Sequence, residues 1–109
     1  MELFRVAGRA TTIVFPIMDF ENRPRTGASS LDSEWIAWSD GVAPGNGNNF
    51  ADMAAEATEI YTSGMYSLAV AAGEVPAASP YVMIRVISGN AATQYILIRT
   101  ASVYANVQG

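Results

Sequence analysis

The chain has 109 residues, half of them hydrophobic and 15% of them charged, and this balance predicts a folded domain rather than a disordered segment. It contains neither cysteine nor histidine, which excludes disulfides, thiolate metal sites and catalytic triads of the Ser-His-Asp and Cys-His kinds. A formal charge of −4 disfavours the basic groove that a nucleic-acid backbone requires, so no nucleic-acid partner is expected.

The N-terminal segment has no feature of a signal peptide or a membrane anchor. Glu2, Arg5 and Arg9 fall where a signal peptide needs apolar residues. The longest apolar run, IVFPIM, is far shorter than the ~20 residues of a membrane helix. We therefore expect a soluble, unprocessed protein with one domain over residues 1–109, no membrane contact and no cofactor.

The first two expected strands are Glu2–Ala7 and Ala10–Phe20. In the second strand, alternate apolar residues predict one buried face, made of Ile13, Phe15 and Ile17. Pro16 lies inside this run and cannot donate a ladder hydrogen bond, so this strand is expected to lie at a sheet edge or to bulge. Turn-forming residues follow at positions 21–27.

A third strand is expected over Ser33–Gly41, with Trp35 on one face and Trp38 on the other, ended by the turn pair at positions 40–41. A Gly/Asn-rich loop occupies positions 42–50. The segment Asn48–Tyr61 is ambiguous, because an Asn cap and several alanines favour a helix while the propensities alone do not decide between helix and strand.

The second half of the chain predicts three more strands. They span Gly64–Ala72, Tyr81–Ser88 and Thr93–Ala101, and a bend with one helical turn occupies positions 73–80. About seven short strands at regular spacing, without an internal repeat, predict an all-β fold, a two-sheet antiparallel sandwich.

The last two strands also predict their own register. Val82, Ile84 and Val86 need the core, as do Ile96 and Ile98. Directly paired residues share a face, so Ile84 is expected opposite Ile96, and Val82 opposite Ile98. This requires an odd loop of about five residues centred on Asn90, because a two-residue turn would expose one apolar row.

The stretch ATEIYTSGMYSLAVAAGEV, residues 57–75, resembles the small immunoglobulin-like β-sandwich proteins of tailed bacteriophages. The shared features are an acid-Ile step at Glu59, a Gly-aromatic pair at Gly64 and Tyr66, an alternating strand, and an Ala-x-Glu bend at Glu74. TTIVFPIMDFENRPRTG resembles the opening strand and Asp-led turn of these proteins, and YVMIRVISGNAATQYILIRT resembles their closing hairpin.

This resemblance covers roughly residues 8–100 and implies an immunoglobulin-like sandwich and a structural role in the virion. Such proteins occur as capsid decoration or cement proteins and as adaptors near tail tips and fibres. The implied partners are the major capsid protein or other virion subunits, in a homo-oligomer or symmetric array, and the implied location is the virion. The resemblance also makes Phe50–Met53 a short strand rather than helix.

Several residues invite a chemical function beside a structural one. The acid pairs Asp32 with Glu34 and Glu56 with Glu59 have the spacing of paired carboxylates, but surface acids are far commoner than glycosidase sites, and no catalytic residue is predicted. Positions 40–52 lack the oxygen ligands of an EF-hand loop, which leaves only a calcium site of another kind, and no metal site is predicted.

The aromatic residues Trp35, Trp38 and Tyr61 suggest a sugar-stacking platform, and hence a carbohydrate-binding module as the alternative function. We favour a structural interpretation, in which one tryptophan anchors the core and the other packs at its rim. Tyr66 is expected in the core, with its hydroxyl group hydrogen-bonded at the end of a sheet.

The strands of the last hairpin also predict a partner-binding face. If their alternate residues fill the core, six others point outward: Tyr81, Met83, Arg85, Tyr95, Leu97 and Arg99. Tyrosine, methionine and arginine are enriched at protein interfaces, so we expect this face to bind a partner unless a segment of the same chain covers it.

Gly64 is the predicted structural turn residue. It follows Thr-Ser and precedes an aromatic strand, where a glycine with positive φ is favoured.

Overall fold

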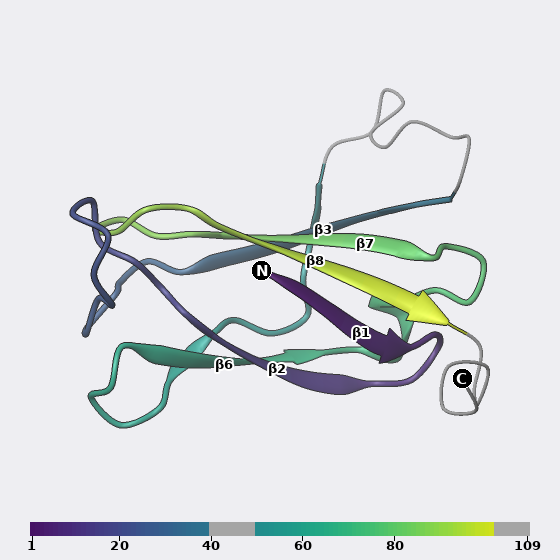
Figure 1. Ribbon diagram of the computed structural model, residues 1–109, viewed down its shortest axis with the longest axis horizontal. Helices are drawn as coiled ribbons and strands as arrows, with labels where there is room; N and C mark the ends of the chain where they lie inside the picture. Colours follow the sequence, from purple (N-terminus) through teal and green to yellow (C-terminus); the bar gives the residue numbers. More distant parts are fainter. Residues whose placement is uncertain (40–49, 102–109) are drawn as a thin grey trace.

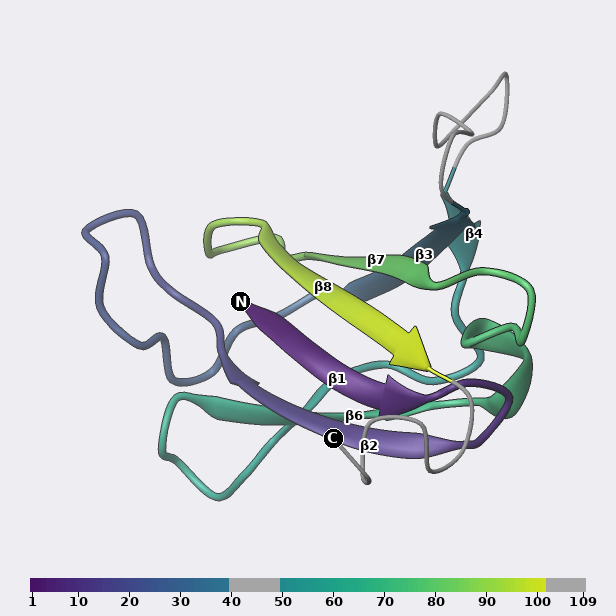
Figure 2. The same cartoon turned by 45° about the vertical axis from the view of Figure 1, so that its right-hand side comes forward.

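The computed structural model of the protein describes residues 1–39 and 50–101. These residues form two layers of strands joined by loops (Figures 1 and 2). The elements, in chain order, are β1 (Glu2–Val6), β2 (Thr11–Pro16), β3 (Asp32–Trp38), β4 (Ala51–Asp52), β5 (Thr58–Glu59), β6 (Met65–Val70), the 3-10 helix η1 (Ala72–Glu74), β7 (Tyr81–Ile87) and β8 (Gln94–Ala101).

The two sheets have the strand order of an immunoglobulin-like sandwich, which confirms the predicted fold class. One sheet has the order β1-β8-β7-β3-β4 and the other the order β2-β6-β5. Neighbouring strands are antiparallel, with one departure from the prediction: β1 pairs in parallel with β8. The chain therefore crosses between the sheets from β1 to β2.

The core lies between the sheets and is filled by alternate residues of the long strands. The residues predicted to be buried in β2, β6, β7 and β8, and at Ile17 just after β2, are all at most 1% exposed: Ile13, Phe15, Ile17, Tyr66, Leu68, Val70, Val82, Ile84, Val86, Ile96 and Ile98. The predicted register of the last hairpin is confirmed, because Ile84 pairs with Ile96 and Val82 with Ile98. The last pair joins Val86 to Gln94, and the loop between them is centred on Asn90.

Two further predictions are confirmed, one about the position of β2 and one about the strand at positions 50–53. β2 lies at the edge of the three-stranded sheet, where Pro16 ends the strand opposite Met65. The ambiguous segment that follows the Gly/Asn loop begins as strand β4, in which Ala51 pairs with Trp35, and not as a helix. The turn expected at positions 40–41 and most of the loop lie outside the described residues.

The hydrogen bonds of Glu59 give a structural reason for the acid-Ile step in residues 57–75. One of its carboxylate oxygens accepts a hydrogen bond from the backbone N–H of Gly27 and the other from that of Gly64, each at 2.9 Å. Gly64 has φ = +78°, as predicted, and donates into the carboxylate at the turn before β6. Glu59 therefore ties that turn to the long loop between β2 and β3.

Tyr66 and Glu74 complete this set of structural contacts. The Tyr66 hydroxyl donates to the carbonyl of Arg25 at 2.6 Å and accepts from the N–H of Ala28 at 2.9 Å, so the predicted core tyrosine is confirmed. The buried Glu74 carboxylate accepts from the N–H of Ala71 at 2.8 Å and of Ala54 at 3.0 Å. It thus joins the end of β6 to the segment after β4.

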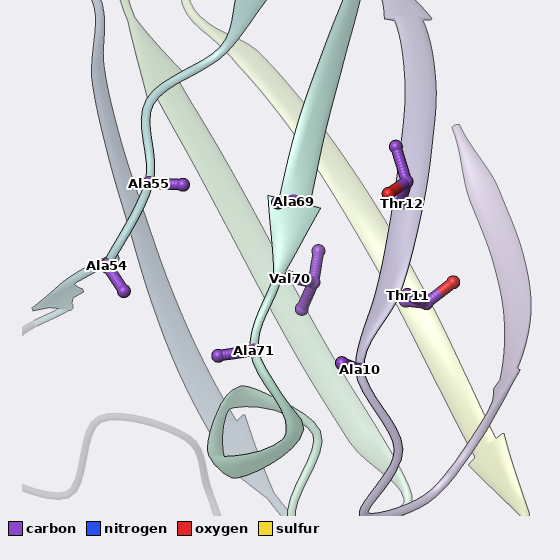
Figure 3. A pocket seen from close by; sticks show the side chains of 8 residues that line it. All are labelled: Ala10, Thr11, Thr12, Ala54, Ala55, Ala69, Val70 and Ala71. Carbon is purple, nitrogen blue, oxygen red and sulfur yellow. The ribbon is translucent and has the colours of Figure 1, made fainter.

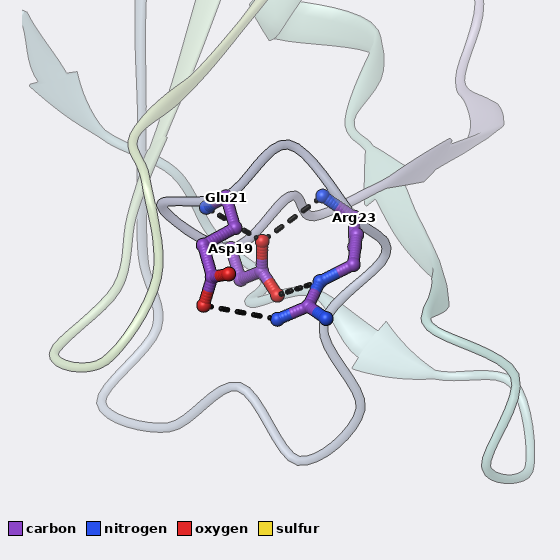
Figure 4. A network of polar contacts seen from close by, with 3 residues as sticks. All are labelled: Asp19, Glu21 and Arg23. Carbon is purple, nitrogen blue, oxygen red and sulfur yellow. Dashed lines mark hydrogen bonds and ion pairs between the residues drawn. The ribbon is translucent and has the colours of Figure 1, made fainter.

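The turn after β2 is organised by Asp19 (Figure 4). Its Oδ1 accepts hydrogen bonds from the backbone N–H groups of Arg23 and Glu21, at 2.9 and 2.8 Å. Its Oδ2 lies 3.3 Å from the Arg23 guanidinium, which also contacts Glu21. The backbone hydrogen bond from Arg23 is the main cause that lowers the pKa of Asp19, because it favours the ionised carboxylate. This is the Asp-led turn noted in the sequence.

Among the described residues there is no helix long and apolar enough to cross a membrane.

Candidate interaction face

All six residues of the predicted partner-binding face lie on the outer surface of the five-stranded sheet. The register places them directly opposite one another on β7 and β8, in the pairs Tyr81–Arg99, Met83–Leu97 and Arg85–Tyr95. Their immediate neighbours in sequence are the buried core residues, so alternation alone fixes their direction.

The flanking strands extend these pairs into three rows across the sheet. Paired residues share a face, so the register of β1, β3 and β4 adds members that the sequence did not identify. The first row is Phe4, Arg99, Tyr81 and Trp38; the second is Glu2, Leu97, Met83 and Ile36; the third is Tyr95, Arg85, Glu34 and Asp52. Finding them required the strand order β1-β8-β7-β3-β4, which the sequence does not state.

Both arginines of this face are paired within it. Arg85 donates from Nε to the Glu34 carboxylate at 3.0 Å, and this hydrogen bond is the main cause that raises the pKa of Arg85. The same guanidinium lies 4.0 Å from the ring centre of Phe50, in a cation–π contact. Arg99 lies 3.4 Å from a Glu2 carboxylate oxygen and 5.6 Å from the ring centre of Tyr81.

Trp38 and Tyr81 stack on this face with their ring centres 5.5 Å apart and their planes inclined by 21°. The three aromatic residues of the suggested sugar platform do not come together. Trp35 faces inward and packs against the core, while Tyr61 is 93% exposed and precedes β6 in the other sheet. The structural interpretation of the tryptophans is confirmed: Trp35 packs on the core, and Trp38 lies outside it at the end of β3.

No described segment lies over the outer face in Figure 2. An N-terminal segment or a loop of the same chain was expected to cover the face if it were internal; most of the Gly/Asn loop lies outside the described residues, and the N-terminal segment is described. It instead forms β1, which extends the sheet at its edge by pairing with β8. Phe4 in this strand is 60% exposed. The backbone of the described residues therefore does not cover this face (Figure 2), and the Phe50 side chain lies against it at Arg85.

The acidic residues singled out in the sequence have other partners. Glu34 binds Arg85, and Glu56 accepts a hydrogen bond from the backbone N–H of Ser33 at 2.7 Å. Glu56 and Glu59 do not share a helical turn, because this part of the chain is not helical. Each of these three carboxylates therefore has a role in holding the sandwich together.

One group of acids was not anticipated. Carboxylate oxygens of Asp32 on β3 and of Asp52 and Glu56, four residues apart in the segment that includes β4, lie within 4.8 Å of one another, a grouping that could hold a metal ion. Desolvation, followed by repulsion from Glu34, Glu56 and Asp52, raises the pKa of Asp32. In the absence of a cation, this group opposes folding when it is ionised.

A hollow beside the three-stranded sheet offers no charged side chain (Figure 3). Its volume is about 340 Å³, and it lies beside the end of β6 and the start of β2. The residues that line it are small and without charge: Ala10, Thr11, Thr12, Ala54, Ala55, Ala69, Val70 and Ala71. The outer face of the five-stranded sheet is therefore the better candidate site.

A search with protein-family models and a search of curated proteins found no match to this chain.

Proposed function

We propose that the chain is a non-enzymatic structural protein of a tailed-bacteriophage virion, which binds neighbouring subunits through the outer face of its five-stranded sheet. The observation that carries the proposal is the composition of this face. Two arginines, two tyrosines, a tryptophan, a methionine, a leucine and an isoleucine share it, and these large side chains are unusual on a surface that meets only water.

The proposal specifies a capsid decoration or cement protein, with the major capsid protein or another virion subunit as the partner. The sequence resemblance supports a virion role. The capsid is favoured over a tail-tip or fibre adaptor because the described residues form short paired strands, without an elongated, repetitive or coiled-coil part. The expected location is the virion, and neither nucleic acid nor a membrane is an expected partner.

The test is a particle-binding assay with the double variant Met83→Glu, Leu97→Glu. Both residues are partly exposed and directly paired in the middle row, so two carboxylates there should abolish binding without altering the core. The matched control is Thr12→Glu, Val14→Glu, which adds the same charge to the outer face of the other sheet.

The expected result is that both variants fold, as judged by circular dichroism, and that only the Met83 and Leu97 variant is lost from sedimented particles. Retention of that variant on particles would place the binding surface elsewhere. If it does not fold, the milder single change Met83→Gln decides: it should still weaken binding relative to Val14→Gln.

A carbohydrate-binding module is the second candidate, favoured by the half-buried stack of Trp38 and Tyr81 on the outer face. Glycan-array binding that disappears in Trp38→Ala, with the fold intact, would support it. Trp35→Ala is not diagnostic, because Trp35 packs against the core.

A further inference from the structure

We infer that the occupant of the outer face is a second copy of this chain, related by a two-fold axis that lies between the two faces and runs across the strands. This inference rests on the proposed function in one respect: it takes the same face as the binding surface. It adds the identity of the partner and the geometry of the contact.

The first argument is charge. Burying an arginine or a glutamate at an interface is costly unless a partner of opposite charge lies beside it. On this face Arg85 is already paired with Glu34, and Arg99 with Glu2. A second copy brings the same charges already paired in the same way, so neither face would bury an unpaired charge.

The second argument is the order of the rows. A two-fold axis along the middle row places the first row of one copy over the third row of the other. Each strand then lies over the same strand of the second copy. On β7, Tyr81 then meets Arg85 of the second copy, and on β8, Arg99 meets Tyr95 of the second copy. Both are arginine–tyrosine contacts, and each occurs twice by symmetry.

The middle row meets itself in this arrangement. Leu97, Met83 and Ile36 lie against their own equivalents and form an apolar centre. At the edge strand β1, Glu2 also meets its own equivalent, and each of these carboxylates lies beside Arg99 of its own copy. An apolar centre with a more polar rim is the usual composition of a protein interface. On β3, Trp38 meets Glu34 of the second copy, and an indole N–H can donate to a carboxylate.

The other face-to-face arrangement has its axis parallel to the strands. It leaves each row opposite itself, so that Arg85 meets Arg85 of the second copy on the central strand β7. Like charges brought together at an interface are unfavourable. This arrangement places them on the central strand, whereas the axis across the strands places them only at the edge strand β1, so we favour the axis across the strands.

The size of the face predicts a weak dimer. Four strands spaced by about 4.8 Å and five residues spaced by about 3.4 Å cover roughly 320 Å² of each copy. This is below the roughly 800 Å² per partner of a standard interface, so we expect a dissociation constant on the order of 10–100 μM. An array of subunits on a particle would strengthen such a contact through high local concentration.

The experiment uses the purified chain alone, without particles. Sedimentation velocity from 5 to 500 μM should show wild type passing from monomer to dimer. Met83→Glu should remain monomeric, and Val14→Glu should dimerise as wild type does. Wild type that stays monomeric at 500 μM would overturn the inference.

Single cysteines then test the geometry, because the chain has no cysteine of its own. Packed sheets lie about 10 Å apart, beyond the reach of a disulfide, so a short bismaleimide is the cross-linker. Met83→Cys and Leu97→Cys should each give cross-linked dimers, and Val14→Cys should not. Cross-linking at Met83 without Leu97 would overturn the proposed axis, because only an axis across the strands brings Leu97 against itself.

This design separates the inference from the proposed function. A monomeric protein that still binds particles would refute the second copy and leave the virion role standing. A dimer that is absent from particles would do the reverse.

Discussion

Replacing Gly64 tests the turn that joins β5 to β6, and the chain provides its own control at Gly27. Both glycines have positive φ, +78° at Gly64 and +67° at Gly27, and both donate a backbone hydrogen bond to Glu59. They differ in their surroundings. A Cβ on Gly64 would lie 2.8 Å from the Cβ of Pro24, whereas a Cβ on Gly27 would meet nothing within 4 Å.

The left-handed conformation costs a non-glycine residue roughly 1–2 kcal/mol, partly offset because alanine restricts the unfolded chain. Gly27→Ala should therefore lower the free energy of unfolding by about 1 kcal/mol. Gly64→Ala carries the same strain and must also displace Pro24, which adds about 1–3 kcal/mol of overpacking. The expected loss is about 2–4 kcal/mol, and Gly64→Val should lose at least as much.

Urea unfolding followed by circular dichroism measures both variants against wild type. The difference between the two alanine variants isolates the contact with Pro24 from the backbone strain. Equal losses at Gly64 and Gly27 would refute the close packing of the turn against the β2–β3 loop.

Four further results are expected. Tyr66→Phe should lower the free energy of unfolding by about 1–3 kcal/mol, because it leaves two backbone groups without their hydroxyl partner, whereas Tyr61→Phe at an exposed site should change it little. Asp19→Asn should destabilise the protein at pH 7, because folding lowers the pKa of Asp19. The Asp19 carboxylate therefore stabilises the folded state above pH 3.8, the ordinary pKa of the group, and this stabilisation is lost as the pH falls below that value. Asp32→Asn should stabilise the protein at pH 7, because folding raises the pKa of Asp32 and the ionised carboxylate therefore destabilises the folded state above pH 3.8. The free energies of unfolding of wild type and variant, measured against pH, should converge near pH 3. A chelator should leave the melting temperature unchanged; a fall of more than about 5 °C, roughly 1 kcal/mol for this size, would reveal a structural ion at the acid group.

The features that sequence predicted best are those controlled by local pattern. Val82, Ile84 and Val86 alternate without interruption, as do Ile96 and Ile98, so one register alone buries both rows. Gly64 was identified because few residues other than glycine adopt positive φ at a tight turn.

The features that sequence missed depend on contacts between distant segments. The parallel pairing of β1 with β8 joins the two ends of the described chain, and no local pattern encodes it. The propensities alone did not decide the strand at Ala51 and Asp52, which was predicted from the resemblance, because pairing with the distant strand β3 outweighs propensity. The acid group of Asp32, Asp52 and Glu56 was missed because the pairing of β4 with β3 brings Asp32 close to the other two.

The sequence predicted the residues of the candidate face that lie on β7 and β8, but not those on β1, β3 and β4. The hairpin supplied Met83 and Leu97 together with their four neighbours in the pattern, because a single alternation determines both the core and the surface of a strand. Trp38 and Phe4 join the same face only through the order of the strands, and the pairing of Arg85 with Glu34 depends on the register of β3.

The most direct test of the central claim is a cryo-microscopy reconstruction of purified virions that contain this chain. The account predicts a small two-sheet sandwich on the particle, with the outer face of β8, β7 and β3 in contact with another subunit. Met83 and Leu97 should lie at the centre of that contact. A sandwich that is present on the particle with this face open to solvent would contradict the account.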